Sequence, residues 1–392
     1  MGRPAVGVVG ASGRAAVGSL LRAGFAAWAV DLFADRDLRR TAACARCPAD
    51  DYPAALPVLT ESFPPGPVLY IGGLENHPAV VAELAARRLL WGNPPDVLAA
   101  ARDPFLVSRV LTPRGANFPF PEVRPADAPP PEIDCDWLLK PRSGAGGHGI
   151  RRWRPGDPLP AHPERWYFQQ LVDGTPMSAL FLAARPYHAL LGVTEQLVGT
   201  PWLHAGPFRY AGNIGPVLVN CSKEYVLGRA GRELAEAAGL RGLWGFDYVE
   251  AEPDGPFPVE VNPRYTAGLE VLEYATGVPF LLGHAAAFGG GFPLPIPGVV
   301  LSRAVGKAIY FAPHRIAFPA AGLWDADLSG DVHPWRLPAF ADIPEPGEVI
   351  EPGHPVLTFF AQGSTADECR ARLQSTAAEL DGLFGREAET TP

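Results

Sequence analysis

The first hundred residues alternate between short apolar runs and amphipathic segments. The apolar runs have the length of buried strands and are 5–10, 26–33, 68–73 and 89–93. Between them, residues 15–23 and 78–88 have helical spacing. Strands that alternate with helices predict βαβ units and a parallel, doubly wound sheet. We therefore expect a Rossmann-like N-terminal domain over residues 1–100.

After the proline-rich connector FPFPEVRPADAPPP, the pattern changes to longer strands and hairpins mixed with helices. A second segment rich in proline and glycine, 289–298, predicts another boundary. We expect a second domain over 101–290 and a small C-terminal α+β domain over 291–392. The elements expected in these two domains are strands at 136–141, 165–172, 177–184, 188–198, 304–312 and 355–361, and helices at 225–240 and 366–384. The predicted fold class is α/β and α+β, multidomain.

Composition narrows the class of protein. Apolar residues make up 47% and charged residues 19% of the 392 residues, which is typical of a globular protein. The net charge of −9 disfavours a nucleic-acid-binding face, and no uncharged apolar run is long enough to span a membrane. The five cysteines are an odd, scattered set without the spacing of a disulfide framework. We expect a cytoplasmic protein that binds neither nucleic acid nor membrane.

A glycine-rich turn follows the opening strand and contains Gly7, Gly10, Ser12 and Gly13. Such a turn at a helix N-terminus can accept a phosphate. Asp31 stands where a dinucleotide-binding fold places its ribose-binding acid. The spacing is not GxGxxG, however, and glycine in this turn also serves close packing of the helix on the strand. Nicotinamide binding is therefore the weaker hypothesis.

Lysine is scarce in this chain, and Lys140 is one of only three. It ends a predicted strand and precedes a loop with Gly144, Gly146, Gly147 and Gly149. Glycine lets the backbone approach a ligand closely, successive N–H groups in such a loop bind anions, and lysine supplies a point charge for phosphate. Because the lysine precedes the glycines, the spacing is not that of a P-loop. The alternative is a flexible hairpin loop that binds nothing.

Two predicted strands that flank the turn at 252–255 carry Asp247, Glu260 and Asn262. If the hairpin is symmetric about the bond between residues 253 and 254, Asp247 faces Glu260. Two carboxylates so placed repel each other, and a proton or a divalent cation would offset the repulsion. Oxygen ligands favour Mg²⁺ or Mn²⁺. The alternative is that one carboxylate points to solvent.

The order of these features resembles that of the ATP-grasp superfamily. Lys140 with its glycine loop comes first, the segment 168–174 second, and the hairpin with Pro-Val-Glu-Val-Asn-Pro-Arg at 258–264 third, followed by Glu-Tyr-Ala-Thr-Gly at 273–277. The resemblance implies a Rossmann-like domain, a two-lobed nucleotide clamp and a small C-terminal domain, with ATP and Mg²⁺ (or Mn²⁺) as cofactors. Within the superfamily, the chain is most similar to the carboxylate–amine ligase branch that includes pyrrolysine-type and tyramine–glutamate ligases.

The resemblance also implies roles for individual residues. Lys140 and Arg264 would be catalytic, Lys140 on the phosphates and Arg264 on the charge of the transferring phosphoryl group. Asp247, Glu260 and Asn262 would hold one or two metal ions. The residues implied for the loop that closes over the phosphates are Ser143, Gly144, Ala145, Gly146 and Gly147. Those implied for the adenine-reading hinge and the ribose are Gln169, Gln170, Leu171, Val172 and Asp173.

One position departs from the family pattern. Members usually have an Asp-Lys pair at the start of the clamp, whereas this chain has Asp103 and Pro104, so Arg102 or another basic group would have to substitute. Two glutamates after the hairpin, Glu270 and Glu273, are expected either to bind an acceptor amine or to face solvent. The segment with Trp202, Phe208 and Tyr210 is expected to face a substrate, or else to be a surface loop with a local aromatic cluster.

The reaction that the resemblance implies is attack of a carboxylate on ATP to give an acyl phosphate, followed by attack of an amine. An amino acid or glutamyl substrate in cofactor biosynthesis is expected, so the partners are small-molecule carboxylate and amine substrates. The carboxylase-type resemblance is also compatible with a homodimer. The alternatives are a non-catalytic ATP-binding protein, in which Pro104 marks lost turnover, and a nicotinamide-dependent oxidoreductase that uses the Gly7–Gly13 turn.

Overall fold

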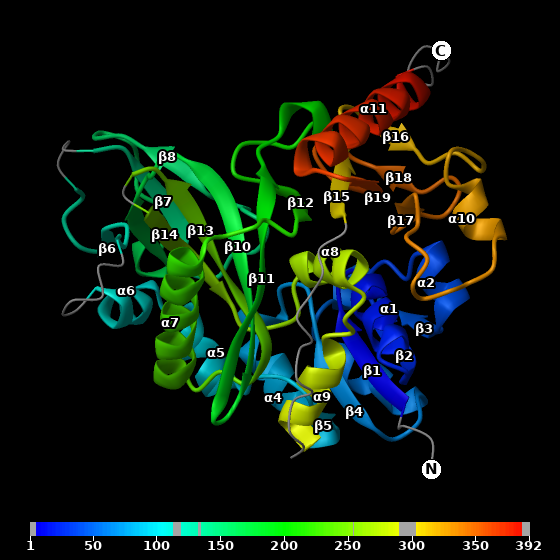
Figure 1. Cartoon of the computed structure of the whole chain (residues 1–392), viewed down its shortest axis with the longest axis horizontal. Helices are drawn as coiled ribbons and strands as arrows, with labels where there is room; N and C mark the ends of the chain where they lie inside the picture. Colours follow the sequence, from blue (N-terminus) through cyan, green and yellow to red (C-terminus); the bar gives the residue numbers. More distant parts are fainter. Residues whose placement is uncertain (1–4, 113–118, 132–134, 254, 290–302, 386–392) are drawn as a thin grey trace.

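A five-stranded parallel sheet with strand order β3-β2-β1-β4-β5 forms the N-terminal part of the molecule (Figure 1). The computed structural model describes residues 5–112, 119–131, 135–253, 255–289 and 303–385. The strands are β1 (Ala5–Gly10), β2 (Ala26–Asp31), β3 (Ala43–Arg46), β4 (Pro67–Tyr70) and β5 (Leu89–Leu90), and the helices are α1 (Arg14–Arg22), α2 (Arg36–Thr41), α3 (Leu56–Leu59) and α4 (Pro78–Arg87). This strand order is that of a Rossmann-type sheet, so the predicted parallel sheet is confirmed. Strand β3, which the sequence analysis did not anticipate, extends it.

A second sheet of eight antiparallel strands runs through the rest of the molecule in the order β14-β13-β10-β11-β12-β15-β19-β17. Its strands are β10 (Thr175–Ala184), β11 (Tyr187–Val198), β12 (Tyr210–Gly215), β13 (Gly242–Ala251), β14 (Gly255–Asn262), β15 (Ala304–Phe311), β17 (Phe340–Ala341) and β19 (Pro355–Gly363). Of the expected C-terminal strands, β15 pairs with β12 and β19 pairs with β15, so both continue this sheet rather than forming a sheet of their own. The expected boundary at 290 lies outside the described residues.

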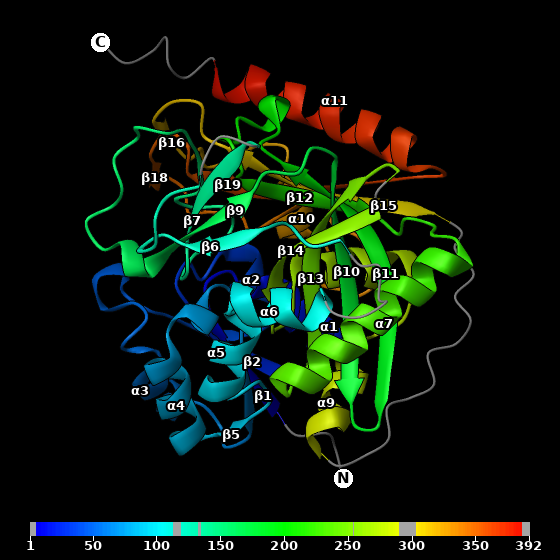
Figure 2. The same ribbon diagram turned by 90° about the vertical axis from the view of Figure 1, so that its left-hand side faces the viewer.

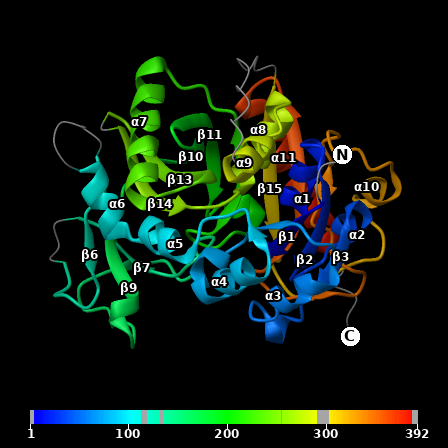
Figure 3. The same ribbon diagram turned by 90° about the horizontal axis from the view of Figure 1, so that it is seen from below.

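A smaller four-stranded sheet with the order β6-β9-β7-β8 forms a separate lobe. Its strands are β6 (Val123–Pro125), β7 (Trp137–Pro141), β8 (Arg151–Trp153) and β9 (Trp166–Gln170). In Figure 2 this lobe lies above helices α5 (Pro95–Arg102) and α6 (Pro104–Leu111), and Figure 3 shows α5 between the lobe and the N-terminal sheet.

The large sheet is buried on both faces, as the alternating side chains of β10 show. Phe181 and its neighbours on one face pack with helix α7 (Cys221–Ala238), while Leu180 and Leu182 on the other face pack with α8 (Ala267–Thr276), α9 (Leu281–Gly289) and the N-terminal domain. The C-terminal helix α11 (Ala366–Phe384) covers β15 and β19. The remaining elements are the short pair β16 (Ile316–Ala317) and β18 (Val349–Ile350) and helix α10 (Asp325–Ser329).

Buried charges join α8 to the N-terminal and C-terminal regions. Glu270 is fully buried, and it accepts hydrogen bonds from the Arg14 guanidinium of α1 (Nη2–Oε2 3.0 Å) and from Lys307 Nζ of β15 (2.8 Å). Glu273, also fully buried, pairs with Arg22 (Nη2–Oε2 2.6 Å). The expectation that these glutamates bind an amine or face solvent is therefore wrong. Both hold domains together, because a buried carboxylate needs a cationic partner.

His284 on α9 is another buried polar residue that connects separate parts of the chain. It is 4% exposed, and its two ring nitrogens have different partners. The backbone N–H of Leu243 donates to Nδ1 (2.9 Å), and Nε2 lies 3.1 Å from the carbonyl oxygen of Trp91, to which it donates. This arrangement requires a neutral imidazole with its proton on Nε2. Burial accordingly lowers the pKa of His284 to about 4.

The free energy of unfolding should therefore decrease as the pH falls from about 6.5 to about 4. The unfolded imidazole takes up a proton below about pH 6.5, whereas the folded one stays neutral down to about pH 4. The stability contributed by neutral His284 is thus present above pH 6.5 and decreases by about 3 kcal/mol by pH 4. Urea unfolding at pH 7.0 and 5.0 should show a smaller loss for His284→Asn than for the wild type. An equal loss in both would contradict this role.

Among the described helices, none has the length and apolar character needed to cross a bilayer. Cys44, Cys47, Cys221 and Cys369 form no disulfide in the structure.

Candidate nucleotide-binding site

A cavity of about 890 Å³ lies between the four-stranded lobe and the large sheet. Its volume falls within the range of small-molecule sites. Residues predicted from three separate segments of the sequence line it together, among them Lys140, Gln169, Asp247, Glu260, Asn262 and Arg264. The fold therefore brings the lysine, the predicted hinge and the carboxylate hairpin to one place.

Strands β13 and β14 place Asp247 directly opposite Glu260, as the symmetric hairpin predicted. The prediction placed the centre of the turn between residues 253 and 254, but in the structure Ala251 pairs with Gly255. Continued without a break, this register would bring Val259 and not Glu260 opposite Asp247. A β-bulge between Asp247 and Tyr248 on the paired strands adds one residue and restores the match. The bulge is what puts the two carboxylates side by side.

The backbone carbonyl of Val259, at this bulge, accepts hydrogen bonds from two side chains of the four-stranded lobe. Lys140 Nζ donates to it (3.3 Å) and to Gln169 Oε1 (2.9 Å), and Gln169 Nε2 lies 3.5 Å from the same carbonyl oxygen. Lys140 and Gln169 are 6% and 1% exposed. The ammonium of Lys140 is thereby held at the edge of the cavity, close to Glu260.

The two carboxylates have opposite electrostatic surroundings. Burial and the charge of Glu260 raise the pKa of Asp247 to about 6, although Gln196 Nε2 and Asn262 Nδ2 each donate to it at 2.9 Å. Burial alone would raise the pKa of Glu260 as well, but the charges of Arg102 and Lys140 outweigh it and hold that pKa below its usual value. Among the described residues, no cation forms an ion pair with Asp247, whereas Arg102 pairs with Glu260.

These residues fit a divalent cation by the chemistry of their oxygens. Asp247, Glu260 and Asn262 lie on one face of the hairpin and line the cavity, and their side chains offer the hard oxygen donors that suit Mg²⁺ or Mn²⁺. No group of three or more His, Cys, Asp or Glu side chains gathers as a metal site in the part of the chain that the structure describes. A metal ion bound here would therefore need Asn262 and oxygen atoms of a bound substrate to complete its coordination shell.

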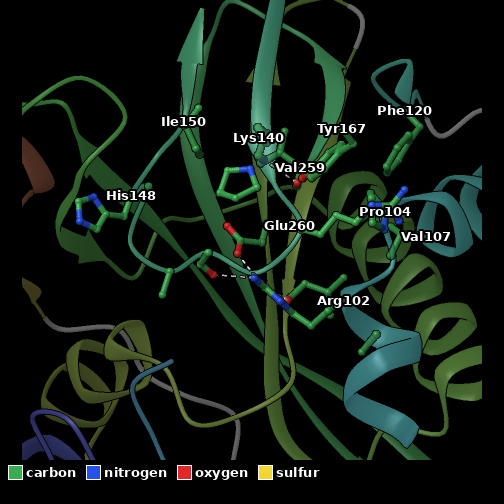
Figure 4. A pocket seen from close by; sticks show the side chains of 17 residues that line it. Arg102, Pro104, Val107, Phe120, Lys140, His148, Ile150, Tyr167, Val259 and Glu260 are labelled. Atoms are coloured by element: carbon green, nitrogen blue, oxygen red, sulfur yellow. Dashed lines mark hydrogen bonds and ion pairs between the residues drawn. The ribbon is translucent and has the colours of Figure 1, made fainter. Parts of the chain in front are cut away.

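Arg102 reaches the site from the end of α5, two residues before the proline that replaces the usual lysine (Figure 4). Its guanidinium forms an ion pair with Glu260 and donates from Nη2 to the carbonyl oxygen of Gly144 (2.7 Å). From the sequence, we expected Arg102 or another basic group to substitute for the missing lysine. The structure places it at the glycine loop and at one of the predicted metal ligands.

Arg264 lines the cavity, but a carboxylate that the sequence analysis missed already binds it. Its Nε lies 2.9 Å from both carboxylate oxygens of Glu75, a residue of the N-terminal domain that is 5% exposed. No local pattern around Glu75 marks this contact, since the two residues are far apart in the sequence. The pair fixes the guanidinium within electrostatic range of Asp247, where its charge offsets part of the rise in the pKa of that carboxyl.

The glycine loop is closed over the cavity. Gly146 and Gly147 line the cavity, and the Gly146 carbonyl accepts a hydrogen bond from the Tyr210 backbone N–H (3.2 Å). Gly144 and Ala145 instead line a smaller, adjacent cavity of about 40 Å³. Ser143 is exposed and lines neither cavity, so the structure does not bring it to the site.

Gly147 cannot be replaced without opening the loop. Its φ is +77°, and a Cβ there would lie 1.7 Å from the carbonyl oxygen of Phe208. Gly147→Ala should therefore raise the KM for ATP about tenfold or more. Gly146→Ala is the matched control, because its φ of +58° is similarly strained but a Cβ would meet nothing within 4 Å. Steady-state kinetics that showed equal effects for the two variants would contradict this role of the closed loop.

The predicted hinge borders the cavity with Gln169, Gln170, Leu171 and Val172. The backbone N–H groups of Gln170 and Leu171 already donate to the carbonyls of Glu122 and Asp136 (2.8 Å each). Recognition of a base would thus fall to Val172 and to the hinge carbonyls. Asp173, predicted to lie near a ribose, is exposed and is not among the lining residues.

Phe208 and Tyr210 line the cavity, as expected for a substrate-facing segment, whereas Trp202 packs against the core of the C-terminal region. The Asp31 carboxylate is fully buried and accepts hydrogen bonds from the backbone N–H groups of Gly13, Phe33 and Ala34. It stabilises the glycine turn and is not exposed to a ribose, which removes its support for the nicotinamide hypothesis.

A lysine, a closed glycine loop and paired carboxylates thus lie together between the four-stranded lobe and the large sheet. Residues 101–268 match the family model of the ATP-grasp domain, so this part of the chain is an ATP-grasp domain. No curated protein sequence matches the chain significantly.

Three solved structures illustrate the similarity of fold. The L-amino acid ligase of Bacillus licheniformis has 15% identity and a TM-score of 0.67, with 97% of this chain and 98% of that chain covered. N5-carboxyaminoimidazole ribonucleotide synthetase of Thermus thermophilus has 16% identity and a TM-score of 0.65, with coverage of 94% and 98%. Biotin carboxylase of Campylobacter jejuni has 14% identity and a TM-score of 0.67, with coverage of 93% and 89%. The fold shared with these three structures therefore extends over nearly the whole chain.

Proposed function

We propose that the protein is an ATP-dependent carboxylate–amine ligase that uses Mg²⁺ or Mn²⁺ and releases ADP and phosphate. The observation that carries this proposal is the pairing of Asp247 with Glu260 in a cavity that Lys140 and the glycine loop also line. A binding protein for a neutral ligand would have no need for opposed acids beside a buried lysine. The similar solved structures include an L-amino acid ligase and a phosphoribosylamine–glycine ligase, which supports an amide-forming reaction.

The chemistry begins when a substrate carboxylate oxygen attacks the γ-phosphorus of ATP, which forms an acyl phosphate and releases ADP. The amine nitrogen then attacks the acyl carbon, phosphate leaves with the C–O bond electrons, and the nitrogen loses a proton. Neither step needs a nucleophile from the protein, so the protein acts by positioning and by neutralising charge. A divalent cation, when bound, would neutralise phosphate charge.

The roles proposed for the chain's own residues follow from their positions. Lys140, held by Gln169 and Val259, presents a positive charge to the phosphates. The closed loop excludes water and offers backbone N–H groups from Gly146 and Gly147. Arg264, oriented by Glu75, adds positive charge beside the carboxylates. Asp247, Glu260 and Asn262 would hold the metal.

The substrates proposed are an amino acid or a glutamyl compound as one partner and a small amine as the other, in cofactor biosynthesis. Phe208 and Tyr210 at the cavity wall support a substrate with an apolar or aromatic part. The homodimer expected from the sequence stays a prediction.

The test is ADP release with ATP and Mg²⁺ across a panel of amino acids, supplied singly and in pairs, with coupled detection of phosphate. A ligase should form ADP and phosphate in equal amounts only when both an acid and an amine are present. Calorimetric titration with ATP, ADP and NAD, with and without Mg²⁺, is run in parallel. Binding of ATP without turnover on any pair would favour the non-catalytic alternative, and binding of NAD alone would contradict the proposal.

A further inference from the structure

Arg102 makes contacts that a simple replacement of a phosphate-binding lysine would not explain. Its side chain is 11% exposed, and its guanidinium spans two groups with different functions. On one side it pairs with the carboxylate of Glu260 and donates to the carbonyl of Val261 (3.3 Å). On the other side it donates to the carbonyl of Gly144 at the start of the glycine loop (2.7 Å). One cation thus joins a predicted metal ligand to the loop that covers the cavity.

We call the contacts of Arg102 with Glu260 and with the Gly144 carbonyl the clasp, and the N-terminal domain supports it. Asn76 Nδ2 donates to the Gly144 carbonyl (3.1 Å), and the Asn76 amide oxygen lies 3.5 Å from Arg102 Nη2. The closed loop is therefore held from two elements outside it, α5 and the turn at Leu74–Asn76. Both contacts involve a backbone carbonyl, so they depend on the position of the loop and not on its side chains.

The clasp and a metal ion compete for one carboxylate. While Arg102 neutralises Glu260, a divalent cation at Glu260 would bring two positive groups against the same oxygens, and like charges at that distance repel. The Arg102 Nε–H is buried and has no hydrogen-bond partner among the described residues. The adjacent cavity of about 40 Å³, which Tyr167 and Lys140 line with Arg102, gives the guanidinium space to turn.

We propose that Arg102 is a positioning residue that couples closure of the glycine loop to metal binding at Glu260. In the protein without metal it neutralises Glu260 and holds the loop through Gly144. When a cation takes Glu260, the guanidinium is released from that carboxylate and the loop loses one of its two outer contacts. This inference rests on the metal site of the proposed function, and it adds a residue and a coupling that the proposed function does not require.

The test uses the full chain without nucleotide. Mn²⁺ binding is measured by electron paramagnetic resonance, and loop opening by hydrogen exchange of a peptide that covers residues 141–150. Arg102→Ala should bind Mn²⁺ about tenfold more tightly than the wild type, because the competing cation is gone. Its loop amides should exchange about tenfold faster, because the charged contact to Gly144 is lost. A merely structural role would not tighten metal binding.

The matched control is Arg109→Ala on the neighbouring helix α6, whose side chain is 69% exposed and which should change neither measurement. If Arg102→Ala does not fold, Asn76→Ala carries the test. It removes the loop contact and the long contact to Arg102 Nη2 but leaves the ion pair of Arg102 with Glu260, so exchange should rise roughly fivefold while Mn²⁺ affinity changes less than in Arg102→Ala.

Unchanged or weaker Mn²⁺ binding by Arg102→Ala, or unchanged loop exchange in Arg102→Ala or Asn76→Ala, would overturn the coupling. Both measurements work without catalysis. A protein that forms no ADP with any substrate pair could therefore still show the coupling, and an active ligase could still lack it.

Discussion

Replacing Glu260 with alanine should lower the rate of ADP formation by about 100-fold or more. The variant loses one of the two opposed carboxylates that would hold a divalent cation, and removal of one preorganised charge at a reacting centre costs about this much in turnover. The loss should appear in kcat, measured with saturating ATP, acid and amine. Glu260→Gln, which keeps the shape of the side chain but not its charge, should lose a similar amount.

The control for this prediction is Glu252→Ala. Glu252 lies at the turn of the same hairpin with its side chain 79% exposed, and its replacement should leave turnover unchanged. Circular dichroism would verify that each variant is folded. If the Glu260 variants retained turnover within threefold of the wild type, the assignment of a metal to this hairpin would be wrong.

Replacing Glu270 with alanine should reduce the free energy of unfolding by about 3–5 kcal/mol, because it leaves Arg14 and Lys307 buried without their shared carboxylate. Arg14 would keep its contact with Asp342 (2.9 Å), whereas Lys307 would lose its ion pair. The measurement is urea unfolding followed by tryptophan fluorescence. Glu83→Ala is the control, since its pair with Arg87 lies at the surface and should contribute little.

The same glutamate gives a pH dependence with a definite sign. Burial alone would raise the pKa of Glu270, but the charges of Arg14 and Lys307 outweigh it and hold that pKa well below its usual value. The ion pairs therefore stabilise the protein above the pKa of an unfolded glutamate, about 4.3, and this contribution is lost as the pH falls further. Between pH 5 and 3 the wild type should lose more stability than Glu270→Ala. A midpoint of unfolding in Glu270→Ala that matched the wild type at neutral pH would show that these ion pairs contribute nothing.

The hairpin at the site shows how far local sequence reasoning reaches. Equal spacing about the turn predicted that Asp247 faces Glu260, and the structure has this pair. The bulge that makes the pairing possible was not predictable, since one extra residue in a strand leaves no clear trace in an alternating pattern. The pairing was found because the predicted symmetry and the bulge lead to the same register.

Glu270 shows the opposite case. Its position on a helix after the hairpin was predictable, and helix α8 includes it. For an acidic residue on a helix beside a predicted site, we expected either contact with an amine substrate or exposure to solvent. In the structure Glu270 is instead buried and paired with two cations. Its partners Arg14 and Lys307 are more than 30 residues away in the sequence, and no local pattern identifies charges that meet only after the domains pack.

Sequence patterns were enough to predict the parallel N-terminal sheet, the strand with Lys140, the glycine loop and the acidic hairpin. These features follow from periodicity, turn residues and local spacing, which act over a few residues. Which charges pair depends instead on how the folded chain packs. Arg102 meets Glu260, Arg264 meets Glu75 and Arg14 meets Glu270 across distances of 158, 189 and 256 residues along the chain. Burial in the packed molecule gives each of these carboxylates a specific cation, because an unpaired buried charge would destabilise the fold.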